Sequence, residues 1–229
     1  MNKKIAILDS GYGGVKTLEH LKKLLPNEDF ILFKDEANYP YGTKKIKQLR
    51  EILAKNVAYL SSLNVKLIVV ACNTAGTQLE FIKTITDVPI LEPISATTEF
   101  IKSKKEYEKA KILLLATNLT VKKGEYKRRL KGYKLKSVKA QRLVELAENN
   151  VKDKKTIRNI VKKGEGADLV ILGCTHFGCF SSEIREYSNC KEVIESSYVL
   201  AKRVKSYLKE KKLMSTCGNS NTILITRLT

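Results

Sequence analysis

The sequence has no tryptophan and only two histidines, two methionines and four prolines in 229 residues. It contains no apolar run that approaches the roughly 20 residues of a membrane-spanning helix. The apolar residues 5–8 are too few for the core of a secretory signal peptide, and no cleavage site of small residues follows them. We therefore expect a cytoplasmic protein with neither a leader nor a membrane anchor.

Acidic residues are scarce as well, because 24 aspartates and glutamates stand against 43 lysines and arginines, for a formal net charge of +19. The lysines are spread along the whole chain, without a basic block and without interleaved aromatic residues. This distribution is typical of a solvated, lysine-rich surface. Two functional interpretations stay open, the steering of a small anionic substrate and the attraction of nucleic acid. We expect the first of these and no nucleic-acid partner.

The five cysteines predict neither a disulfide framework nor a metal centre. Their number is odd and their spacing is irregular in a chain that is not small, so reduced thiols are the default. Cys174, His176 and Cys179 have a spacing that metal ligands use, but no fourth ligand is evident. We interpret Cys190 and Cys217 as incidental.

The glycine-rich residues after the first predicted strand match only part of the dinucleotide-binding fingerprint. Gly11 and Gly13 begin a glycine-rich turn, but Lys16 stands where the third glycine of G-x-G-x-x-G belongs. These glycines fit a tight turn that lets backbone N–H groups approach a carboxylate. The sequence therefore predicts no nicotinamide cofactor.

Apolar segments of strand length alternate with amphipathic segments from the start of the chain. Residues 5–8, 30–33 and 67–70 are predicted to be buried strands, and the segments between them have apolar residues at helical spacing. This alternation predicts an α/β fold in which a parallel sheet is covered by helices on both faces.

The pattern then begins again at residue 112, and residues 169–172 match residues 67–70 in character. Cys72 follows the predicted strand at residues 67–70, and Cys174 follows the one at residues 169–172, each after one small residue. The two cysteines are 174 − 72 = 102 residues apart. We therefore expect a duplicated α/β unit, with two pseudo-symmetric domains and an active site in the cleft between them. The predicted domains are residues 1–97, joined by residues 205–229, and residues 98–204.

Polar residues follow four of the predicted strands, two in each half. Ligands of parallel α/β sheets bind outside the carboxyl ends of the strands. A cleft between the two halves would therefore bring the four groups face to face. The groups are residues 9–10, 72–74, 117–120 and 174–176.

Two opposed cysteines suit the inversion of a carbon centre without a cofactor. One group removes a proton from one face while the other supplies a proton to the opposite face, and the reverse reaction exchanges their roles. A thiol with a pKa of about 8.5 serves in either role once tuned. Asp9 and His176 are placed to tune Cys72 and Cys174, respectively. Structural alternatives stay open, since a buried thiol can be inert and Asp9 can cap a helix.

Five short motifs spread along the chain together resemble the motifs of one protein family. They are D-S-G-x-G-G at residues 9–14, D-x-A-x-x-P-Y-G-T at residues 35–43, V-A-C-N-T-A at residues 70–75, E-P at residues 92–93 and L-G-C-T-H at residues 172–176. In this combination, the sequence resembles the glutamate racemase family over nearly its whole length.

The resemblance implies removal and return of the α-proton of glutamate, without pyridoxal phosphate, a metal ion or any other cofactor. It assigns Cys72, assisted by Asp9, to D-glutamate, and Cys174, assisted by His176 and Glu148, to L-glutamate. It also implies a homodimer that supplies D-glutamate for peptidoglycan. The residues that it assigns to holding the substrate are Ser10, Pro40, Tyr41, Gly42, Asn73, Thr74, Thr117, Thr120 and Thr175.

Some alternatives remain within this interpretation. The family's Val-Pro-Leu-Val-Glu segment corresponds to residues 144–148, which favours Glu148 as the assisting carboxylate and leaves Glu145 as the alternative. The runner-up function is an aspartate racemase or another racemase with two cysteines. His176 argues against it, because relatives with other substrates tend to carry Glu at this position. A nucleic-acid-binding protein with a degenerate site is the alternative from another class.

Overall fold

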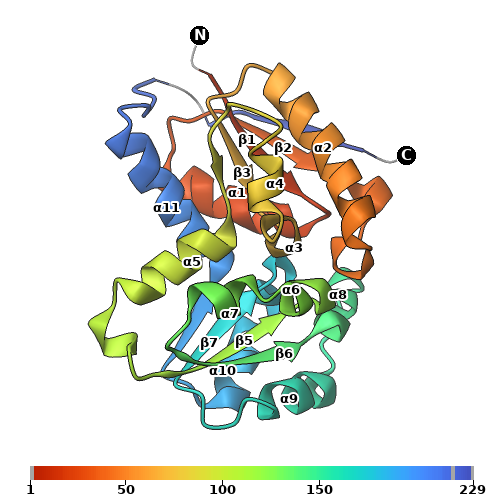
Figure 1. Ribbon diagram of the computed structural model, residues 1–229, viewed down its shortest axis with the longest axis vertical. Coiled ribbons are helices and arrows are strands. Elements are labelled where there is room, and N and C mark those ends of the chain that lie inside the picture. Colours follow the sequence, from red (N-terminus) through yellow and green to blue (C-terminus); the bar gives the residue numbers. More distant parts are fainter. Residues whose placement is uncertain (1–2, 218–219, 228–229) are drawn as a thin grey trace.

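The computed structural model describes residues 3–217 and 220–227, and it contains two sheets whose strands are all parallel (Figure 1). The first sheet has the strand order β4-β3-β1-β2-β9, and the second has the order β6-β5-β7-β8. The strands of the first sheet are β1 (Ile5–Asp9), β2 (Phe30–Lys34), β3 (Leu67–Val70), β4 (Ile90–Leu91) and β9 (Thr222–Thr226). Those of the second sheet are β5 (Lys111–Ala116), β6 (Lys134–Lys139), β7 (Leu169–Gly173) and β8 (Glu192–Glu195).

The two sheets repeat the same topology. The order β4-β3-β1-β2 in the first sheet corresponds to β8-β7-β5-β6 in the second, so β3 and β7 occupy matching places. The prediction of an α/β fold with two parallel sheets flanked by helices is therefore confirmed. The division into residues 1–97 with 205–229 and residues 98–204 stays a prediction.

Helices cover both faces of each sheet, because successive side chains of a strand point to opposite faces. In β1, Ile5 and Ile7 pack against α1 (Gly13–Leu24), α5 (Pro93–Lys102) and α11 (Ser196–Glu210). Ala6 and Leu8 pack against α2 (Ile46–Ser62), α3 (Asn73–Gly76) and α4 (Leu79–Ile82). No helix within residues 3–217 and 220–227 has both the length and the apolar character needed to cross a membrane. The other helices are α6 (Asn118–Lys123), α7 (Glu125–Arg129), α8 (Gln141–Glu148), α9 (Lys154–Lys162) and α10 (Ser181–Ser188).

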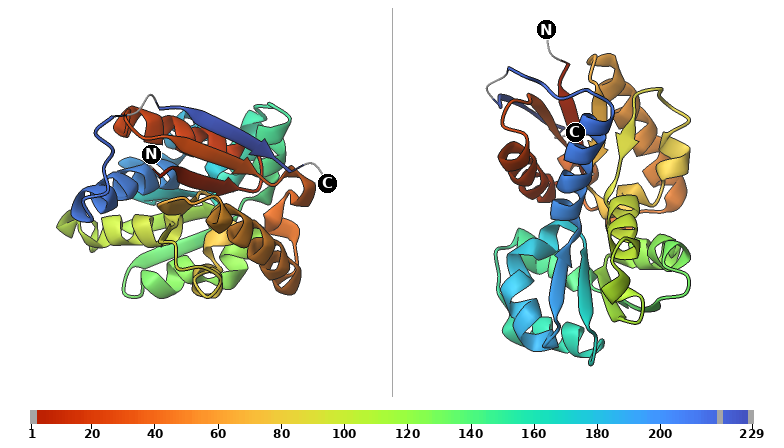
Figure 2. Two further views of the ribbon diagram at one scale, coloured as in Figure 1. Left: turned by 90° about the horizontal axis from the view of Figure 1, so that it is seen from above. Right: turned by 90° about the vertical axis from the view of Figure 1, so that its left-hand side faces the viewer.

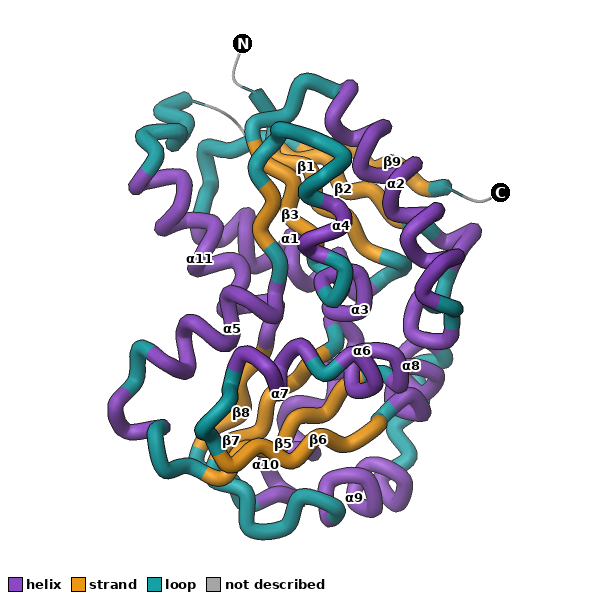
Figure 3. The backbone as a smooth tube through the Cα atoms, in the orientation of Figure 1, coloured by secondary structure: helices purple, strands orange, loops and turns teal. Residues whose placement is uncertain are grey.

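One apolar core passes between the two halves. Ile7 of the first sheet and Leu114 of the second belong to the same buried cluster, together with residues of α5 and α11. These two helices lie side by side along one edge of the molecule and contact each other, as the views of Figures 2 and 3 show. The halves are therefore joined on this edge, and the carboxyl ends of their strands face the junction.

The last strand of the chain lies beside an early one. Strand β9 pairs with β2, on the opposite side from β1. Just after β9, the Arg227 carbonyl oxygen accepts a hydrogen bond from the Ala37 N–H at 2.9 Å. The Arg227 guanidinium also donates to Asn56 Oδ1 at 3.2 Å. The C-terminal segment thereby contacts the loop that follows β2.

Candidate active site

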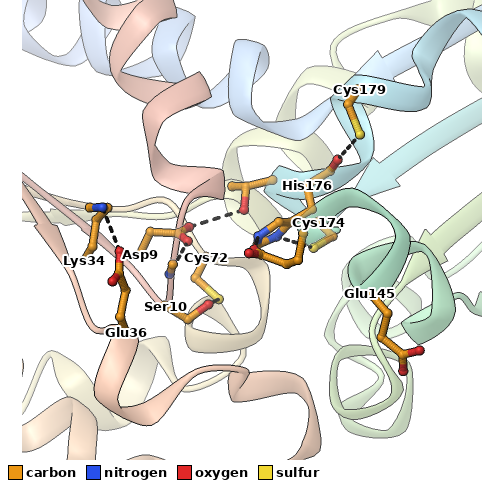
Figure 4. A network of polar contacts seen from close by, with 12 residues as sticks. Asp9, Ser10, Lys34, Glu36, Cys72, Glu145, Cys174, His176 and Cys179 are labelled. Atoms are coloured by element: carbon orange, nitrogen blue, oxygen red, sulfur yellow. Dashed lines mark hydrogen bonds and ion pairs between the residues drawn. The ribbon is translucent and has the colours of Figure 1, made fainter. Parts of the chain in front are cut away.

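Polar side chains from the strand ends of both sheets meet at the junction (Figure 4). Asp9 ends β1 and accepts a hydrogen bond from Thr175 of the other half, with 3.3 Å between Oδ2 and Oγ1. The hydroxyl oxygens of Thr74 and Thr117 lie 2.9 Å apart across the same junction. The structure thus brings together the four polar groups that were predicted to face one another.

Cys72 is a buried thiol at the start of α3. Its sulfur lies 3.8 Å from the Ser10 hydroxyl oxygen. Burial, and after it the charge of Asp9, raises the pKa of the Cys72 thiol to about 12. Cys72 therefore holds its proton at neutral pH, as a proton donor must.

Asp9 is fully buried next to this thiol. Its Oδ1 accepts a hydrogen bond of 3.0 Å from the Gly11 N–H. Burial raises the pKa of Asp9 from its ordinary 3.8 to about 6, although the charge of His176 and the hydrogen bonds of the carboxylate oppose the rise. Asp9 is therefore a carboxyl group that ionises only slightly below neutral pH.

Replacing Asp9 by asparagine should stabilise the protein above about pH 6 and not near pH 4. The folded protein binds the Asp9 proton more tightly than the unfolded chain, so stability falls as the pH rises from about 4 to about 6 and stays level above. The difference between 3.8 and about 6 corresponds to on the order of 3 kcal/mol. Urea unfolding of the wild type and Asp9→Asn at both pH values measures it. The exposed Asp87, replaced in the same way, is the control, and an equal effect of Asp9→Asn at both pH values would refute this account.

Cys174 follows β7 and has a different environment. Its sulfur lies 3.6 Å from His176 Nδ1, and His176 Nε2 donates a short hydrogen bond to the Glu148 carboxylate. Burial favours the neutral ring, but hydrogen bonds to Cys174 and Glu148 outweigh it and raise the pKa of His176 to about 11. The hydrogen bond from His176 in turn lowers the pKa of Glu148. At neutral pH an imidazolium ring therefore stands beside Cys174, and such a ring stabilises a thiolate.

The two candidate carboxylates of α8 are now distinguished by position. Glu148 contacts His176, whereas Glu145 forms an ion pair with the exposed Arg142. In Figure 4, Glu145 points away from the cysteines. The geometry thus selects Glu148 as the neighbour of His176, and its part in the reaction stays a prediction.

Three threonine hydroxyls form a cluster at another edge of the site. Thr74 Oγ1 lies 2.9 Å from Thr117 Oγ1 and 3.2 Å from Thr120 Oγ1, and the last two are 2.9 Å apart. Gly42 packs on this cluster, because a Cβ atom there would lie 2.9 Å from Thr117 Cβ. Hydroxyl groups donate hydrogen bonds to carboxylates, so the cluster fits the predicted contact with a substrate carboxylate.

The side chains of Asn73 and Tyr41 are engaged within the protein. Asn73 donates to Ser196 Oγ at 3.0 Å and accepts from the Tyr126 hydroxyl at 2.7 Å. The Tyr41 hydroxyl donates to Asp35 at 2.6 Å in the core of the first half. Asn73 therefore fastens α3 to the second half. The substrate contacts predicted for both residues stay predictions, with the Tyr41 backbone as the donor.

The glycines after β1 allow a close approach between the halves. The Gly11 N–H bond to Asp9 is part of the predicted tight turn. A Cβ atom at Gly13 would lie only 2.0 Å from Thr175 Oγ1, and one at Gly14 would lie 2.7 Å from Asp9 Cβ. The sequence predicted the turn but not the packing of Gly13 on the opposite half.

Tyr39 is a residue of the site that the sequence patterns did not single out. Its ring centroid lies 6.0 Å from that of His176, and it interacts with Glu148, since each of the two side chains contributes to the pKa shift of the other. It occupies an unspecified position of the motif at residues 35–43, just before Pro40, to which it is joined by a cis peptide bond. An aromatic residue directly before the Pro-Tyr-Gly turn was the available signal.

A basic hollow of about 510 Å³ opens at the edge of the junction, beside Gly42 and Asn118. It is bordered by both halves of the chain, and its lining contains no acidic residue. Four lysines line it: Lys44, Lys45, Lys122 and Lys139. This edge of the site therefore attracts anions.

The thiol of Cys179 donates to the His176 carbonyl oxygen at 3.0 Å (Figure 4). Among residues 3–217 and 220–227, no three histidine, cysteine, aspartate or glutamate side chains are placed to share a metal ion. Cys174, His176 and Cys179 therefore have the sequence spacing of metal ligands, but their side chains do not converge on one point.

This fold and site define a class of enzyme, in which each half of a duplicated parallel α/β structure presents one cysteine to a shared junction. A family model described as Asp/Glu/Hydantoin racemase matches residues 17–204. The chain belongs to this family and is an amino-acid racemase.

Relatives and solved structures extend the likeness to glutamate racemases. Glutamate racemase 2 of Bacillus subtilis is 32% identical over 231 residues, which cover 96% of this chain and 87% of that protein. A glutamate racemase of Clostridium botulinum is 29% identical over 226 residues, or 93% and 87% of the two chains. The crystal structure of Francisella tularensis glutamate racemase in complex with D-glutamate superposes with a TM-score of 0.90 at 25% identity, covering 98% of this chain and 88% of that one.

Proposed function

We propose that this protein is a glutamate racemase that interconverts L- and D-glutamate by proton transfer between the substrate and two cysteines. The observation that carries the proposal is the placement of Cys72 and Cys174 at matching strand ends of the two sheets. They are close enough for the charge of Cys174 to raise the pKa of Cys72. The proposed acid and base therefore share one site.

The two thiols differ in a way that suits opposite roles. Cys174 removes the α-proton of L-glutamate in its thiolate form, which a neighbouring imidazolium such as that of His176 favours. The electron pair left on Cα is delocalised into the α-carboxylate. Cys72, a thiol with a pKa of about 12, then delivers its proton to the opposite face and gives D-glutamate. Cys174 is now a thiol and Cys72 a thiolate, which is the arrangement that D-glutamate requires. Asp9 assists Cys72, and Glu148 assists through His176.

Several features support an anionic substrate such as glutamate. The threonine cluster offers hydroxyl donors for a carboxylate, and the lysine-lined hollow beside Gly42 favours the approach of an anion. A likeness of 0.90 in TM-score to the D-glutamate complex from Francisella tularensis supports the same substrate. The supply of D-glutamate for peptidoglycan and the homodimer are further parts of this proposal.

A circular dichroism assay with L- and D-glutamate tests the substrate. We expect either enantiomer to lose its signal as it racemises, after removal of metal ions and pyridoxal phosphate, and L-aspartate to react far more slowly. In deuterium oxide the product should carry deuterium at the α-carbon, because the donated proton comes from a thiol that exchanges with solvent. The Cys72→Ser, Cys174→Ser double variant is the control. Faster turnover of aspartate, or turnover without deuterium in the product, would overturn the proposal.

A further inference from the structure

Tyr39 reaches across the junction to the assisting groups of Cys174. It belongs to the loop after β2 in the first half, whereas His176 and Glu148 belong to the second half. Its ring is inclined by 50° to that of His176 at a centroid distance of 6.0 Å. Burial, and after it the charge of Glu148, raises the pKa of Tyr39, so the hydroxyl and this carboxylate are neighbours. A Cβ atom at Gly11 would lie 3.0 Å from the Tyr39 ring, so the ring is confined on that side too.

Glu148 needs more than one partner to be held in a fixed orientation. It lies at the end of α8, and its side chain is 23% exposed, so helix packing alone leaves the carboxylate free to rotate toward solvent. His176 donates a hydrogen bond to it and is the main cause of its lowered pKa, and Tyr39 is a second polar neighbour that also lowers this pKa. The charged groups that face this pair are Lys34 toward Glu148, and Cys174 and Asp9 toward His176.

Hydrogen bonds fix the chain on both sides of Tyr39. The Asn38 amide donates to Asp35 Oδ1 at 2.8 Å, and the Tyr41 hydroxyl donates to Asp35 Oδ2 at 2.6 Å. Asn56 of α2 donates to the same carboxylate at 2.7 Å. The buried Asp35 thus fixes both neighbours of the Tyr39–Pro40 pair. Burial and the charge of Glu148 raise the pKa of Tyr39, so its hydroxyl remains a donor at every working pH.

We propose that Tyr39 is a positioning residue that completes the chain Cys174–His176–Glu148 from the opposite half of the molecule. The groups that assist Cys174 are then complete only where the two halves are in contact. Cys72 has a different set of neighbours, because its sulfur lies beside Ser10 and the charge of Asp9 acts on its pKa after burial, whereas Tyr39 is not among the groups that shift it. The inference rests on the proposed function and predicts that Tyr39 serves one enantiomer of the substrate.

The test requires a reaction that uses one base at a time. In a racemase with an equilibrium constant of one, kcat/KM must be the same in both directions, so racemisation cannot separate the two cysteines. 3-Chloroglutamate can: removal of the α-proton by one cysteine breaks the C–Cl bond, chloride leaves with its electron pair, and the resulting enamine hydrolyses to 2-oxoglutarate and ammonia. The L form needs Cys174 and the D form needs Cys72.

We expect Tyr39→Phe to slow chloride release from the L form by about tenfold, the effect of removing a hydroxyl that interacts with a charged group, and from the D form by less than about twofold. Because the chain has two histidines, carbon-13-labelled histidine gives two ring signals in NMR spectra, and the variant should shift that of His176 and not that of His20. Tyr12→Phe, which alters a 61% exposed tyrosine outside this hydrogen-bonded chain, is the control.

The outcomes separate the two proposals. A wild-type protein that neither racemises glutamate nor releases chloride contradicts the proposed function itself. A wild-type protein that is active, with Tyr39→Phe matching Tyr12→Phe, overturns the role of Tyr39. Equal losses for both enantiomers overturn it too, since they indicate a general loosening of the junction. A selective loss with the L form, together with the shift of the His176 signal, supports it.

Discussion

Cys72→Ser should slow chloride release from D-3-chloroglutamate by about 10³-fold, the typical contribution of a positioned general acid or base, and release from the L form by less than about tenfold. Cys174→Ser should show the reverse preference. The reason is the far higher pKa of an alcohol, which leaves serine unable to hold or release a proton at the working pH as a thiol does. Racemisation should be lost in both variants, since it needs both groups.

The measurement is the initial rate of 2-oxoglutarate formation from each pure enantiomer. Cys190→Ser, at a buried thiol that donates to the Glu192 carbonyl oxygen away from the site, is the matched control and should keep the wild-type rate with both. Equal and mild losses with both enantiomers in Cys72→Ser and Cys174→Ser would exclude the two-base scheme.

Gly13→Ala should reduce kcat/KM for glutamate by on the order of 10²-fold, the loss expected when reacting groups are displaced by about 1 Å. The added methyl group would lie 2.0 Å from Thr175 Oγ1 and 2.6 Å from Thr175 Cβ, well inside van der Waals contact. Thr175 lies between Cys174 and His176, so the clash falls on the second half of the site. The halves must separate slightly to relieve it, and the two sulfur atoms separate with them.

Gly178→Ala provides the comparison for this prediction. It lies in the same turn (Thr175–Phe180), but a Cβ atom there would be 3.5 Å from Glu195, an ordinary contact. This variant should keep kcat/KM within a factor of about two, since it leaves the reacting groups in place. Racemase assays and thermal unfolding of both variants separate lost alignment from lost folding. Wild-type kcat/KM in Gly13→Ala would show that the junction opens freely and that the close packing does not matter.

The interior strands of both sheets were predictable, because strands buried on both faces are short apolar runs. The edge strands β4, β6, β8 and β9 are more exposed and were not predicted. Residues 67–70 were predicted and found as β3 (Leu67–Val70), while β1 extends one residue beyond the prediction, to Asp9. β9 was not predicted, because residues 222–226 lie near the end of the chain and pair with a strand about 190 residues earlier.

The candidate site was predictable only in part. Residues that end parallel strands must share an edge of the sheet, which is why Asp9, Cys72 and Cys174 were found from the sequence. The pairing of Glu148 with His176 came from the family resemblance, since nothing local to α8 distinguishes it from Glu145. The approach of Tyr39 and Gly13 to the second half depends on how two separately formed sheets dock, and no periodicity in the sequence encodes that geometry.

The position of β9 bears on how the molecule is completed during synthesis. The loop that carries Tyr39 begins beside Ala37, which bonds to the backbone of Arg227, and Asn56 links this same arginine to Asp35. A ribosome delivers residue 227 last of all these groups, so a nascent chain can form every other strand before this loop is secured. A segment made late in synthesis therefore secures one of the earliest loops, and the surroundings of Tyr39 are complete only after residue 227 has been added.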